Sequence, residues 1–201
     1  MGELTGKVAI VTGSGRNIGR AIALALADDG ASVVVNSRSN LDEAKAVARE
    51  VETTGQKALV HIGDIADPAS VQAMVDSAVA EFGRIDILVN NAALRREKPF
   101  AEMTYQDWRE VMNVILDGTF HCVKACLPYL KASGAGTIVN IGGLSAHTGA
   151  RDRAHVVTAK AGIITRPPRA AVSRTTRANW ARAPSTDSWS RFPYVDSMMI
   201  A

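Results

Sequence analysis

Two hydrophobic patterns alternate along the first 164 residues. Short runs that are almost continuously apolar predict buried strands, and the longer segments between them, with apolar residues every three to four positions, predict amphipathic helices. Strands and helices that alternate in this way favour a doubly wound parallel sheet with helices on both faces, which is a three-layer α/β/α fold. The predicted strands are 7–12, 32–36, 57–62, 85–90 and 137–141.

Signals at their ends mark several of the predicted helices. Asp67 and Pro68 supply an N-cap and a first-turn proline, and Gly83 ends the helix that follows them. The long helical segment in the middle of the chain has a soft point at Asp117 and Gly118. The predicted helices are 18–29, 41–54, 68–82, 104–131 and 154–164.

The segment from Thr12 to Gly19, TGSGRNIG, links the first predicted strand to the first predicted helix. Glycines in such a turn let the backbone come close to a pyrophosphate, and the N–H groups at the start of the helix attract the same anion. The alternative is a tight strand-to-helix turn that binds no ligand. The candidate cofactor-binding residues in this turn are Gly13, Ser14, Arg16, Asn17, Ile18 and Gly19.

This turn resembles the TGxxxGxG turn of the short-chain dehydrogenase/reductase family, with Asn17 in place of the middle glycine. Asparagine tolerates a left-handed backbone better than most other residues, so the replacement keeps the resemblance. Three further segments match the family in order and spacing. They are Asp64-Ile65, Asn90-Asn91-Ala92-Ala93, which is similar to the family's NNAG segment, and Lys160, which is similar to the lysine of its YxxxK helix.

The resemblance implies a Rossmann-type fold, and among family members the chain is most similar to 3-oxoacyl-acyl-carrier-protein reductases and to sugar or alcohol dehydrogenases. It implies that Asp64 and Ile65 contact the adenine of a nicotinamide dinucleotide, and that Asn91 and Ala92 line the same site. It also implies that Lys160 binds the nicotinamide ribose. The structural alternatives for Asp64 and Asn91 are a cap and a turn residue.

The end of the predicted strand 32–36 bears on the choice of cofactor. An NAD site usually places a carboxylate there, against the ribose 2′-hydroxyl, but this strand is followed by Ser37 and Arg38. Together with Arg16 in the turn, Arg38 offers guanidinium groups that suit a 2′-phosphate in charge and geometry. We therefore expect NADP rather than NAD; the alternative is that both arginines are solvated surface residues.

Three of the four residues that the family uses on its substrate are replaced. Val156, four residues before Lys160, stands where the family has its proton-donating tyrosine. Gly143 occupies the position of the serine, and Ile115 that of the asparagine. Asn113 lies about 200° around the helix from Ile115 and so faces away. Lys160 is thus the one catalytic residue that the resemblance retains.

Two neighbours of these positions are alternative participants. The imidazole of His155 suits proton transfer near neutral pH, but one step along a helix turns its side chain about 100° away from Val156. A packing or surface role is therefore favoured for His155. Ser145 is a candidate substrate contact.

The resemblance implies hydride transfer between NADP and a small carbonyl or alcohol substrate. Because general acid catalysis commonly contributes about 10²- to 10⁴-fold in rate, loss of the donor predicts impaired activity. The first hypothesis is therefore an NADP-dependent oxidoreductase of impaired activity, and the alternative is a non-catalytic NADP-binding protein of the same fold. The resemblance also implies a homo-oligomer that forms through the helix 104–131.

Composition bears on the setting of the protein. No apolar run reaches 18 residues and the first residues lack the profile of a signal peptide, so we expect a cytoplasmic protein that does not enter a membrane. Cys122 and Cys126 lie four residues apart in a predicted helix. This spacing favours free thiols that pack in the core of a protein from a reducing compartment.

The sequence changes character after Ile164. Residues 1–164 carry 17 Lys and Arg against 18 Asp and Glu, whereas residues 165–201 carry six arginines and only two aspartates. Because the positive charge belongs to the tail, we expect no nucleic-acid partner for the body. We predict an incomplete dinucleotide-binding domain over 1–164, without the last strands of the family fold, and an irregular basic tail over 165–201. We expect the tail to arise from a shifted reading frame or a truncated gene; the alternative is a disordered basic binding segment.

Overall fold

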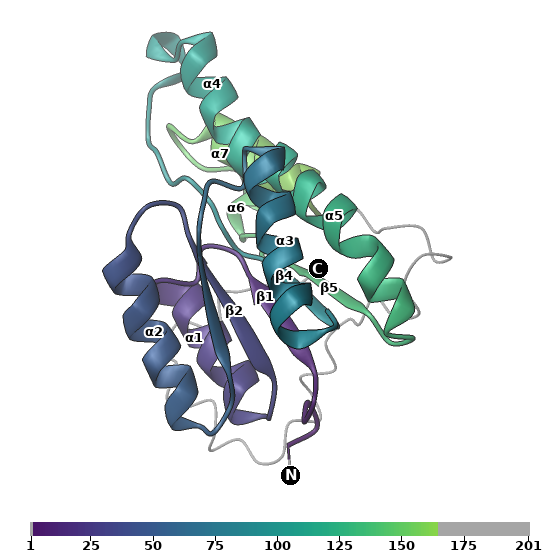
Figure 1. The fold of residues 1–201 in the computed structure, drawn as a ribbon. Coiled ribbons are helices and arrows are strands. Elements are labelled where there is room, and N and C mark those ends of the chain that lie inside the picture. The colour runs from purple at the N-terminus through teal and green to yellow at the C-terminus, as the bar shows by residue number, and fades with distance from the viewer. Residues whose placement is uncertain (1, 165–201) are drawn as a thin grey trace.

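Five parallel strands form the middle layer of the structure, a computed structural model that describes residues 2–164 (Figure 1). Their order across the sheet is β3-β2-β1-β4-β5, so the chain winds outward from β1 in one direction and then in the other, as in Rossmann-type folds. The predicted fold class is therefore confirmed. The strands are β1 (Val8–Val11), β2 (Ser32–Ser37), β3 (Ala58–Ile62), β4 (Ile87–Asn90) and β5 (Thr137–Asn140).

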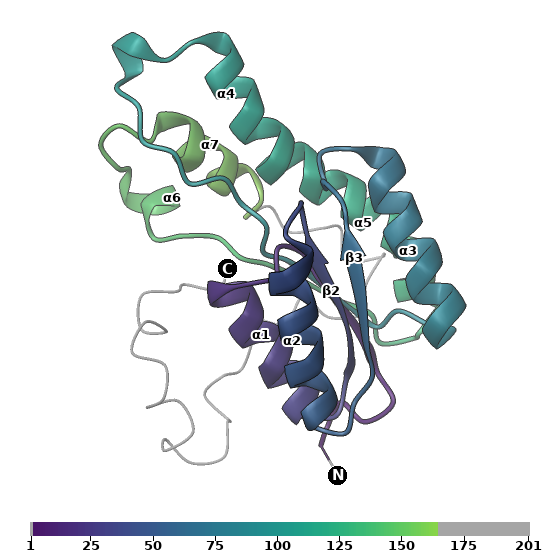
Figure 2. The same cartoon turned by 60° about the vertical axis from the view of Figure 1, so that its left-hand side comes forward.

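Helices cover both faces of this sheet (Figure 2). On one face Val11 and Val33 pack against α1 and α2, and on the other Ile10 and Val34 pack against α3 and α5. Successive residues of a strand point to opposite faces, so the apolar runs supply two cores at once. The helices are α1 (Asn17–Asp28), α2 (Leu41–Thr53), α3 (Pro68–Phe82), α4 (Tyr105–Met112), α5 (Gly118–Ala132), α6 (Ser145–Thr148) and α7 (Ala154–Gly162).

The predicted helix 104–131 forms as α4 and α5 joined by a π-helical turn at Asn113–Asp117. Arg109 bridges this turn, since its guanidinium donates to the side chains of the first and last residues of the turn at 2.6 and 2.9 Å. Gly118 follows directly, and a Cβ there would lie 2.8 Å from the Cδ1 atom of Ile65. The soft point at Asp117 and Gly118 thus corresponds to the end of the π-helical turn.

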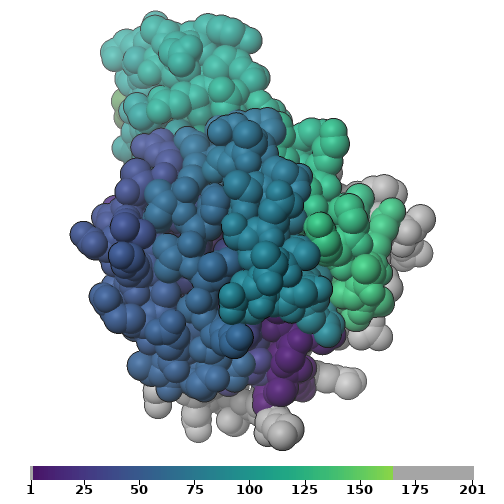
Figure 3. Space-filling model, in the orientation of Figure 1, coloured from purple at the N-terminus to yellow at the C-terminus, as the bar shows by residue number. Residues whose placement is uncertain are grey.

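Helices α4, α6 and α7 lie together beyond the carboxyl ends of the strands, at the top of Figure 1. In the space-filling view the α4 side of this part forms a teal projection above the sheet and its covering helices (Figure 3). A third apolar cluster holds it together. Its buried members are Val111, Met112, Ile115, Val156, Ala159 and Ile163.

Both cysteines are free and fully buried on α5, as predicted. Burial raises the pKa of Cys122 to about 12 and also raises the pKa of Cys126. The thiols therefore stay protonated and act as small core residues.

The last described strand lies at the edge of the sheet. Within residues 2–164, β5 pairs with β4 alone. The basic tail expected over 165–201, its origin and the expected absence of further strands all concern residues outside the described part of the chain. None of the helices within residues 2–164 has the length and apolarity that a membrane crossing requires.

Asp86 ties together the amino ends of β1 and β4. Its side chain is 2% exposed and accepts hydrogen bonds from Arg84 Nε at 2.8 Å, Val8 N at 3.0 Å and Lys7 Nζ at 3.3 Å. Burial by itself raises the pKa of Asp86, but the bonds from Arg84, Val8 and Lys7 outweigh it and hold the pKa below its usual value. The charge of this carboxylate is therefore fully compensated.

We expect Asp86→Asn to lower the free energy of unfolding by about 3 kcal/mol at neutral pH, because it leaves Arg84 and Lys7 without their anion. Since the pKa of Asp86 is lower in the folded chain than in the unfolded chain, its contribution is complete above about pH 4 and disappears as the pH falls through the folded value. Urea unfolding as a function of pH measures the effect. Asp76→Asn, at an exposed position of α3, is the control, and equal losses in both variants would contradict the prediction.

Candidate active site

Polar side chains hold the carboxyl ends of β1 and β4 together. The Asn91 amide Nδ2 donates to the carbonyl oxygens of Thr12 and Gly13 at 2.9 and 3.1 Å. In return, Thr12 Oγ1 accepts the backbone N–H groups of Asn91 and Ala92 at 3.0 and 3.1 Å. The predicted site residues Gly13, Asn91 and Ala92 are therefore brought to one edge of the sheet.

Asn36 joins β2 and β3 to the same edge. Its Oδ1 accepts from Gly13 N at 3.1 Å, and its Nδ2 donates to the carbonyl oxygen of Gly63 at 3.1 Å. The backbone N–H of Asn36 donates to Ser14 Oγ, which itself donates to the carbonyl of Val11. Ser14 is fully buried, so its hydroxyl supports the turn from below. Asn36 is not among the predicted site residues, although a polar residue at the end of the run SVVVN is a signal that could have identified it.

The glycine-rich turn depends on close backbone approaches. Gly13 has φ of +62°, and a Cβ built there would lie 2.9 Å from the Cα of Ala92. At Gly19 a Cβ would lie 2.4 Å from the Gly13 carbonyl oxygen, which no side chain tolerates. Asn17 has φ of +50°, the left-handed conformation that its place in the motif predicts. The N–H groups of the first turn of α1, which includes Ile18, have no partners within the helix.

Arg16 and Arg38 lie on neighbouring segments at the outer side of this turn. A Cβ on Gly15 would touch Ser37 Cβ at 3.4 Å, so the turn is in contact with the end of β2. Arg16 directly follows Gly15, and Arg38 directly follows Ser37. Both arginines are exposed. Arg16 lies 3.9 Å from Glu43 in an exposed ion pair, which contributes little to stability and leaves the guanidinium available to an anion.

Asp64 and Ile65 follow β3 and differ in availability. Asp64 Oδ1 accepts a hydrogen bond from the Ala66 N–H at 2.9 Å, and Asp64 remains partly exposed. Ile65 is 4% exposed, and its side chain packs into the core beneath Gly118. The structure thus leaves Asp64 accessible, whereas the Ile65 side chain is turned inward, where adenine has no access.

Lys160 brings α7 to the end of β5. Its Nζ donates to the carbonyl oxygen of Ile141, and Lys160 itself is 8% exposed. Burial lowers the pKa of Lys160 to about 8 because the charged ammonium loses its hydration. No carboxylate among the described residues pairs with it, in contrast to the fully compensated charge of Asp86.

Of the three replaced catalytic positions, two carry buried apolar side chains and the third is a glycine. Ile115 and Val156, 1% and 9% exposed, pack in the same apolar cluster between α4 and α7. At Gly143 an added Cβ would meet Ser145 Oγ at 3.8 Å and, apart from its neighbours in the chain, no other side chain or backbone atom of residues 2–164 within 4 Å. Asn113 Oδ1 accepts a hydrogen bond from the Arg109 guanidinium at 2.6 Å.

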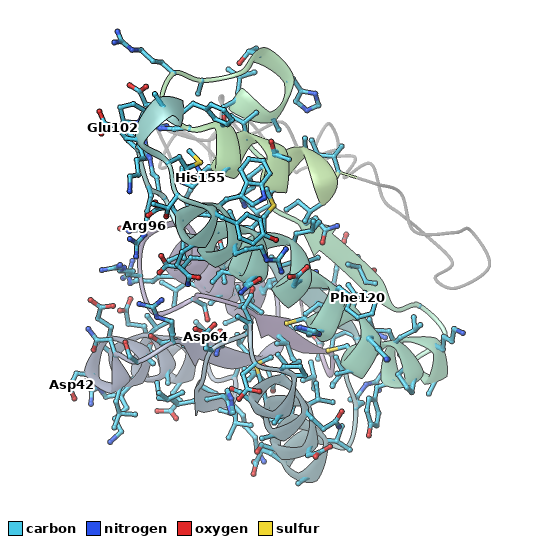
Figure 4. The ribbon with its side chains drawn as sticks, turned by 90° about the horizontal axis from the view of Figure 1, so that it is seen from above. Asp42, Asp64, Arg96, Glu102, Phe120 and His155 are labelled. Carbon is cyan, nitrogen blue, oxygen red and sulfur yellow. The ribbon has the colours of Figure 1, made fainter. Side chains whose placement is uncertain are left out.

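His155 lies in the packing between α7 and α4. It is fully buried, and no described residue forms a hydrogen bond of good geometry with either ring nitrogen; the backbone of Arg153 gives the imidazole a weaker polar interaction. Burial is the main reason that the pKa of His155 is lowered; nearby Asp107 opposes this effect, and Arg96 adds to it. Figure 4 shows His155 and Arg96 at the α4–α7 end of the molecule and Asp64 nearer the sheet. The imidazole has the packing role that helical geometry favoured.

Two chemically different environments therefore meet at one edge of the sheet. The start of α1 and its adjacent arginines suit an anionic ligand. The α4–α7 side presents a buried amine beside apolar side chains. Within residues 2–164 no group of three or more histidine, cysteine or acidic side chains is placed to hold a metal ion.

We expect Lys160→Met to raise the free energy of unfolding at neutral pH by about 3 kcal/mol, because it removes a charge that folding buries. The folded amine has a pKa of about 8, below that of an unfolded lysine, so the wild-type protein regains stability as the pH rises above 8. The advantage of the variant should therefore shrink on alkaline titration. Urea unfolding measures it, with Lys124→Met on the exposed side of α5 as the control; a pH-independent difference would contradict the prediction.

Comparisons with known proteins agree with this geometry. A family model for short chain dehydrogenases matches residues 7–168. The chain is 36% identical over 158 residues to a 3-oxoacyl-acyl-carrier-protein reductase of Staphylococcus aureus, covering 79% of this chain and 64% of the relative. For a reductase of the same name from Synechocystis sp., the identity is 37% over 164 residues, with 82% and 66% covered.

Solved structures show the same fold. A carveol dehydrogenase from Mycobacterium avium in complex with NAD superposes with a TM-score of 0.78 at 26% identity, covering 82% of this chain and 64% of the other. An NAD⁺-bound xylitol dehydrogenase superposes with a TM-score of 0.77 at 32% identity, covering 81% and 62%. The chain thus spans less than two thirds of the length of these relatives. Its sequence match and its fold establish that it belongs to the short-chain dehydrogenase family, whose members are oxidoreductases.

Proposed function

We propose that the chain binds NADP at the carboxyl ends of β1, β2 and β4. The observation that carries the proposal is the glycine-rich turn, where the contacts of Gly13 and Gly19 leave room for backbone alone and the start of α1 presents free N–H groups. The residues proposed to line the cofactor are Gly13, Ser14, Arg16, Asn17, Ile18, Gly19, Arg38, Asp64, Ile65, Asn91, Ala92 and Lys160. Of these, Ser14 and Ile65 act through their backbone, since both side chains are buried.

The preference for NADP over NAD rests on Arg16 and Arg38. They flank the contact between Gly15 and Ser37, and both guanidinium groups are exposed. A 2′-phosphate at this corner gains two charge-assisted partners, whereas the 2′-hydroxyl of NAD gains much less. The two solved relatives described above bind NAD, so the preference for NADP is argued from Arg16 and Arg38 of this chain alone.

The proposed reaction is that of an NADP-dependent oxidoreductase acting on a small carbonyl or alcohol substrate, with impaired activity. When bound, the nicotinamide supplies or accepts the hydride. Lys160 is the residue proposed to act in catalysis, but Val156 and Gly143 beside it offer neither a proton donor nor a hydroxyl to position the substrate oxygen. We place the dinucleotide-binding domain over 1–164, in a cytoplasmic protein that forms homo-oligomers.

A non-catalytic NADP-binding protein of the same fold is the second candidate. The observation that favours it is the burial of Ile115 and Val156 in one apolar cluster, which closes the side of Lys160 where a proton relay would run. Titration of NADPH by fluorescence, followed by NADPH oxidation with a panel of ketones, separates the candidates. Turnover supports the first, binding without turnover supports the second, and absence of binding excludes both.

We expect Arg16→Ala and Arg38→Ala each to weaken NADPH binding roughly tenfold, because each removes one charge-assisted contact to the 2′-phosphate. Binding of NADH should change by less than about threefold in the same variants. Fluorescence titration gives both dissociation constants. Arg49→Ala, at an exposed position of α2, is the matched control. Equal losses for NADPH and NADH would contradict the role assigned to this pair.

We expect the double variant Gly143→Ser, Val156→Tyr to raise ketone-dependent NADPH oxidation about 10²-fold over the parent chain, because it introduces a proton donor and a substrate anchor beside Lys160. A serine Cβ at position 143 would clash with none of the described residues, since its nearest neighbour is Ser145 Oγ at 3.8 Å. Thr158→Ser, at an exposed position of α7, controls for substitution in the same helix. If the variant binds NADPH as the parent does and gains no turnover, the assignment of these positions is wrong.

A further inference from the structure

Asn36 is a buried residue whose four polar groups all bond to segments that follow neighbouring strands. The residue is 2% exposed. Its backbone N–H donates to Ser14 Oγ at 3.1 Å, and its carbonyl oxygen accepts from Ser14 N at 2.8 Å. In the side chain, Oδ1 accepts from Gly13 N at 3.1 Å and Nδ2 donates to the carbonyl oxygen of Gly63 at 3.1 Å. A buried amide bonded in this way has one fixed place in the fold.

The position of Asn36 in the sheet explains why it reaches both segments. Strand β2 lies between β1 and β3, so a side chain at its carboxyl end is close to the ends of both neighbours. Gly13 belongs to the glycine-rich turn after β1, and Gly63 opens the turn after β3. Residues 63–65, which include Asp64, are called the adenine turn below. One planar amide therefore connects the glycine-rich turn to the adenine turn.

The two ends of this amide are not interchangeable. The glycine-rich turn offers an N–H group, which needs an acceptor, whereas the end of β3 offers the carbonyl oxygens of Gly63 and His61, at 3.1 and 3.4 Å, which need a donor. A reversed amide would set Nδ2 against the N–H of Gly13 and Oδ1 against two carbonyl oxygens. Asparagine supplies one acceptor and one donor at the required positions, which neither an aspartate nor an apolar residue does.

Gly63 is held from its other sides as well. Its N–H donates to the carbonyl oxygen of Ser37 at 3.0 Å. A Cβ built on Gly63 would lie 2.0 Å from Ser70 Oγ and 2.7 Å from His61 Nε2, so α3 and β3 close around it. Asp64 follows Gly63 directly, and the place where the adenine turn begins is therefore set by these contacts and by the bond from Asn36.

We propose that Asn36 is a positioning residue that fixes the separation of the glycine-rich turn and the adenine turn before the cofactor binds. The inference rests on the proposed binding of NADP, in which the glycine-rich turn receives the phosphates and Asp64 contacts the adenine. Asn36 acts through Gly13 and Gly63, because its own side chain is buried beneath them.

The physical reason is preorganisation. A dinucleotide that contacts both turns binds most tightly when their separation already matches the ligand, because no ordering of the protein is then required on binding. Without the bond from Asn36 to Gly63, the adenine turn is joined to the glycine-rich turn less firmly, and part of the binding free energy is spent on placing it. The cost falls on the contact with adenine.

The test is a double-mutant cycle on the full-length protein, measured by fluorescence titration of NADPH. Asp64→Asn keeps the Oδ1 that accepts from Ala66 N, but it places an amide donor where the adenine amino group needs an acceptor. We expect Asn36→Ala to weaken NADPH binding roughly tenfold in the parent chain and less than about threefold in Asp64→Asn, where the adenine contact is already lost. Equal losses in both backgrounds, or no loss in the parent, would overturn the proposal.

Asn140→Ala is the matched control. Asn140 ends β5 at the same edge of the sheet, where its Oδ1 accepts from Asn90 Nδ2 and its Nδ2 donates to the carbonyl oxygen of Ile163, both at 2.9 Å. Its removal deletes a similar pair of tertiary bonds, but neither bond involves the two turns. We expect it to change NADPH binding by less than about threefold in both backgrounds. A loss as large as that of Asn36→Ala, with the same dependence on Asp64, would overturn the proposal.

A second measurement approaches the adenine turn from α3 and decides the question if Asn36→Ala does not fold by circular dichroism. Gly63→Ala brings a Cβ against Ser70 Oγ, so it should displace the turn and weaken NADPH binding roughly tenfold. Adding Ser70→Ala removes the nearest atom and should recover at least about threefold of this loss. Unchanged binding in Gly63→Ala, or a loss that Ser70→Ala does not relieve, would overturn the proposal.

Binding of NADPH to the parent chain is measured first, and it separates this inference from the proposed function. Absence of binding excludes the proposed cofactor and, with it, the role of Asn36. Binding to the parent with equal losses in both backgrounds leaves the proposed function standing and overturns the positioning role alone.

Discussion

The contact between the carboxyl ends of β1 and β4 is the constraint on which the site depends. Parallel strands leave their last carbonyl and N–H groups unpaired at this edge, and here Thr12 and Asn91 satisfy them across the two strands. The contact brings Gly13 against Ala92 so closely that a side chain at Gly13 has no space. The direction of α1, and therefore of its free N–H groups, follows from this one approach.

Two buried charges show how differently the molecule treats its structural and its reactive groups. Asp86, at the amino ends of the strands, receives hydrogen bonds from two cations and one backbone N–H. Lys160 lies at the opposite edge. None of the described carboxylates lies beside it, and its amine donates a hydrogen bond to one carbonyl oxygen. The first arrangement stabilises the ionised form, whereas the second destabilises it. A buried charge without a partner lowers the stability of the fold, and groups of this kind are common at functional sites.

Apolar side chains at two of the replaced positions give the α4–α7 side its chemical character. Ile115 and Val156 extend the apolar cluster of α4 and α7 up to the amine, and the π-helical turn that carries Ile115 is bridged by Arg109. The glycine-rich turn with its exposed arginines and the apolar α4–α7 side are thus chemically different parts of the same edge of the sheet.

Periodicity and local signals were enough to predict the strands, most of the helix ends, the free cysteines and the left-handed Asn17, because each depends on residues that are close in the sequence. The partners of polar side chains depend on segments far apart in the chain, and only the tertiary structure decides them. Asn36 binds Gly13 and Gly63, and Ile65 turns into the core beneath Gly118; neither sequence neighbourhood carries this information. The sequence by itself thus determined the family and the place of the glycine-rich turn. The burial of Lys160, with no carboxylate of residues 2–164 beside it, was decided by the packing of α7 against α4 and by its bond to the residue after β5, because desolvation is a property of the assembled fold.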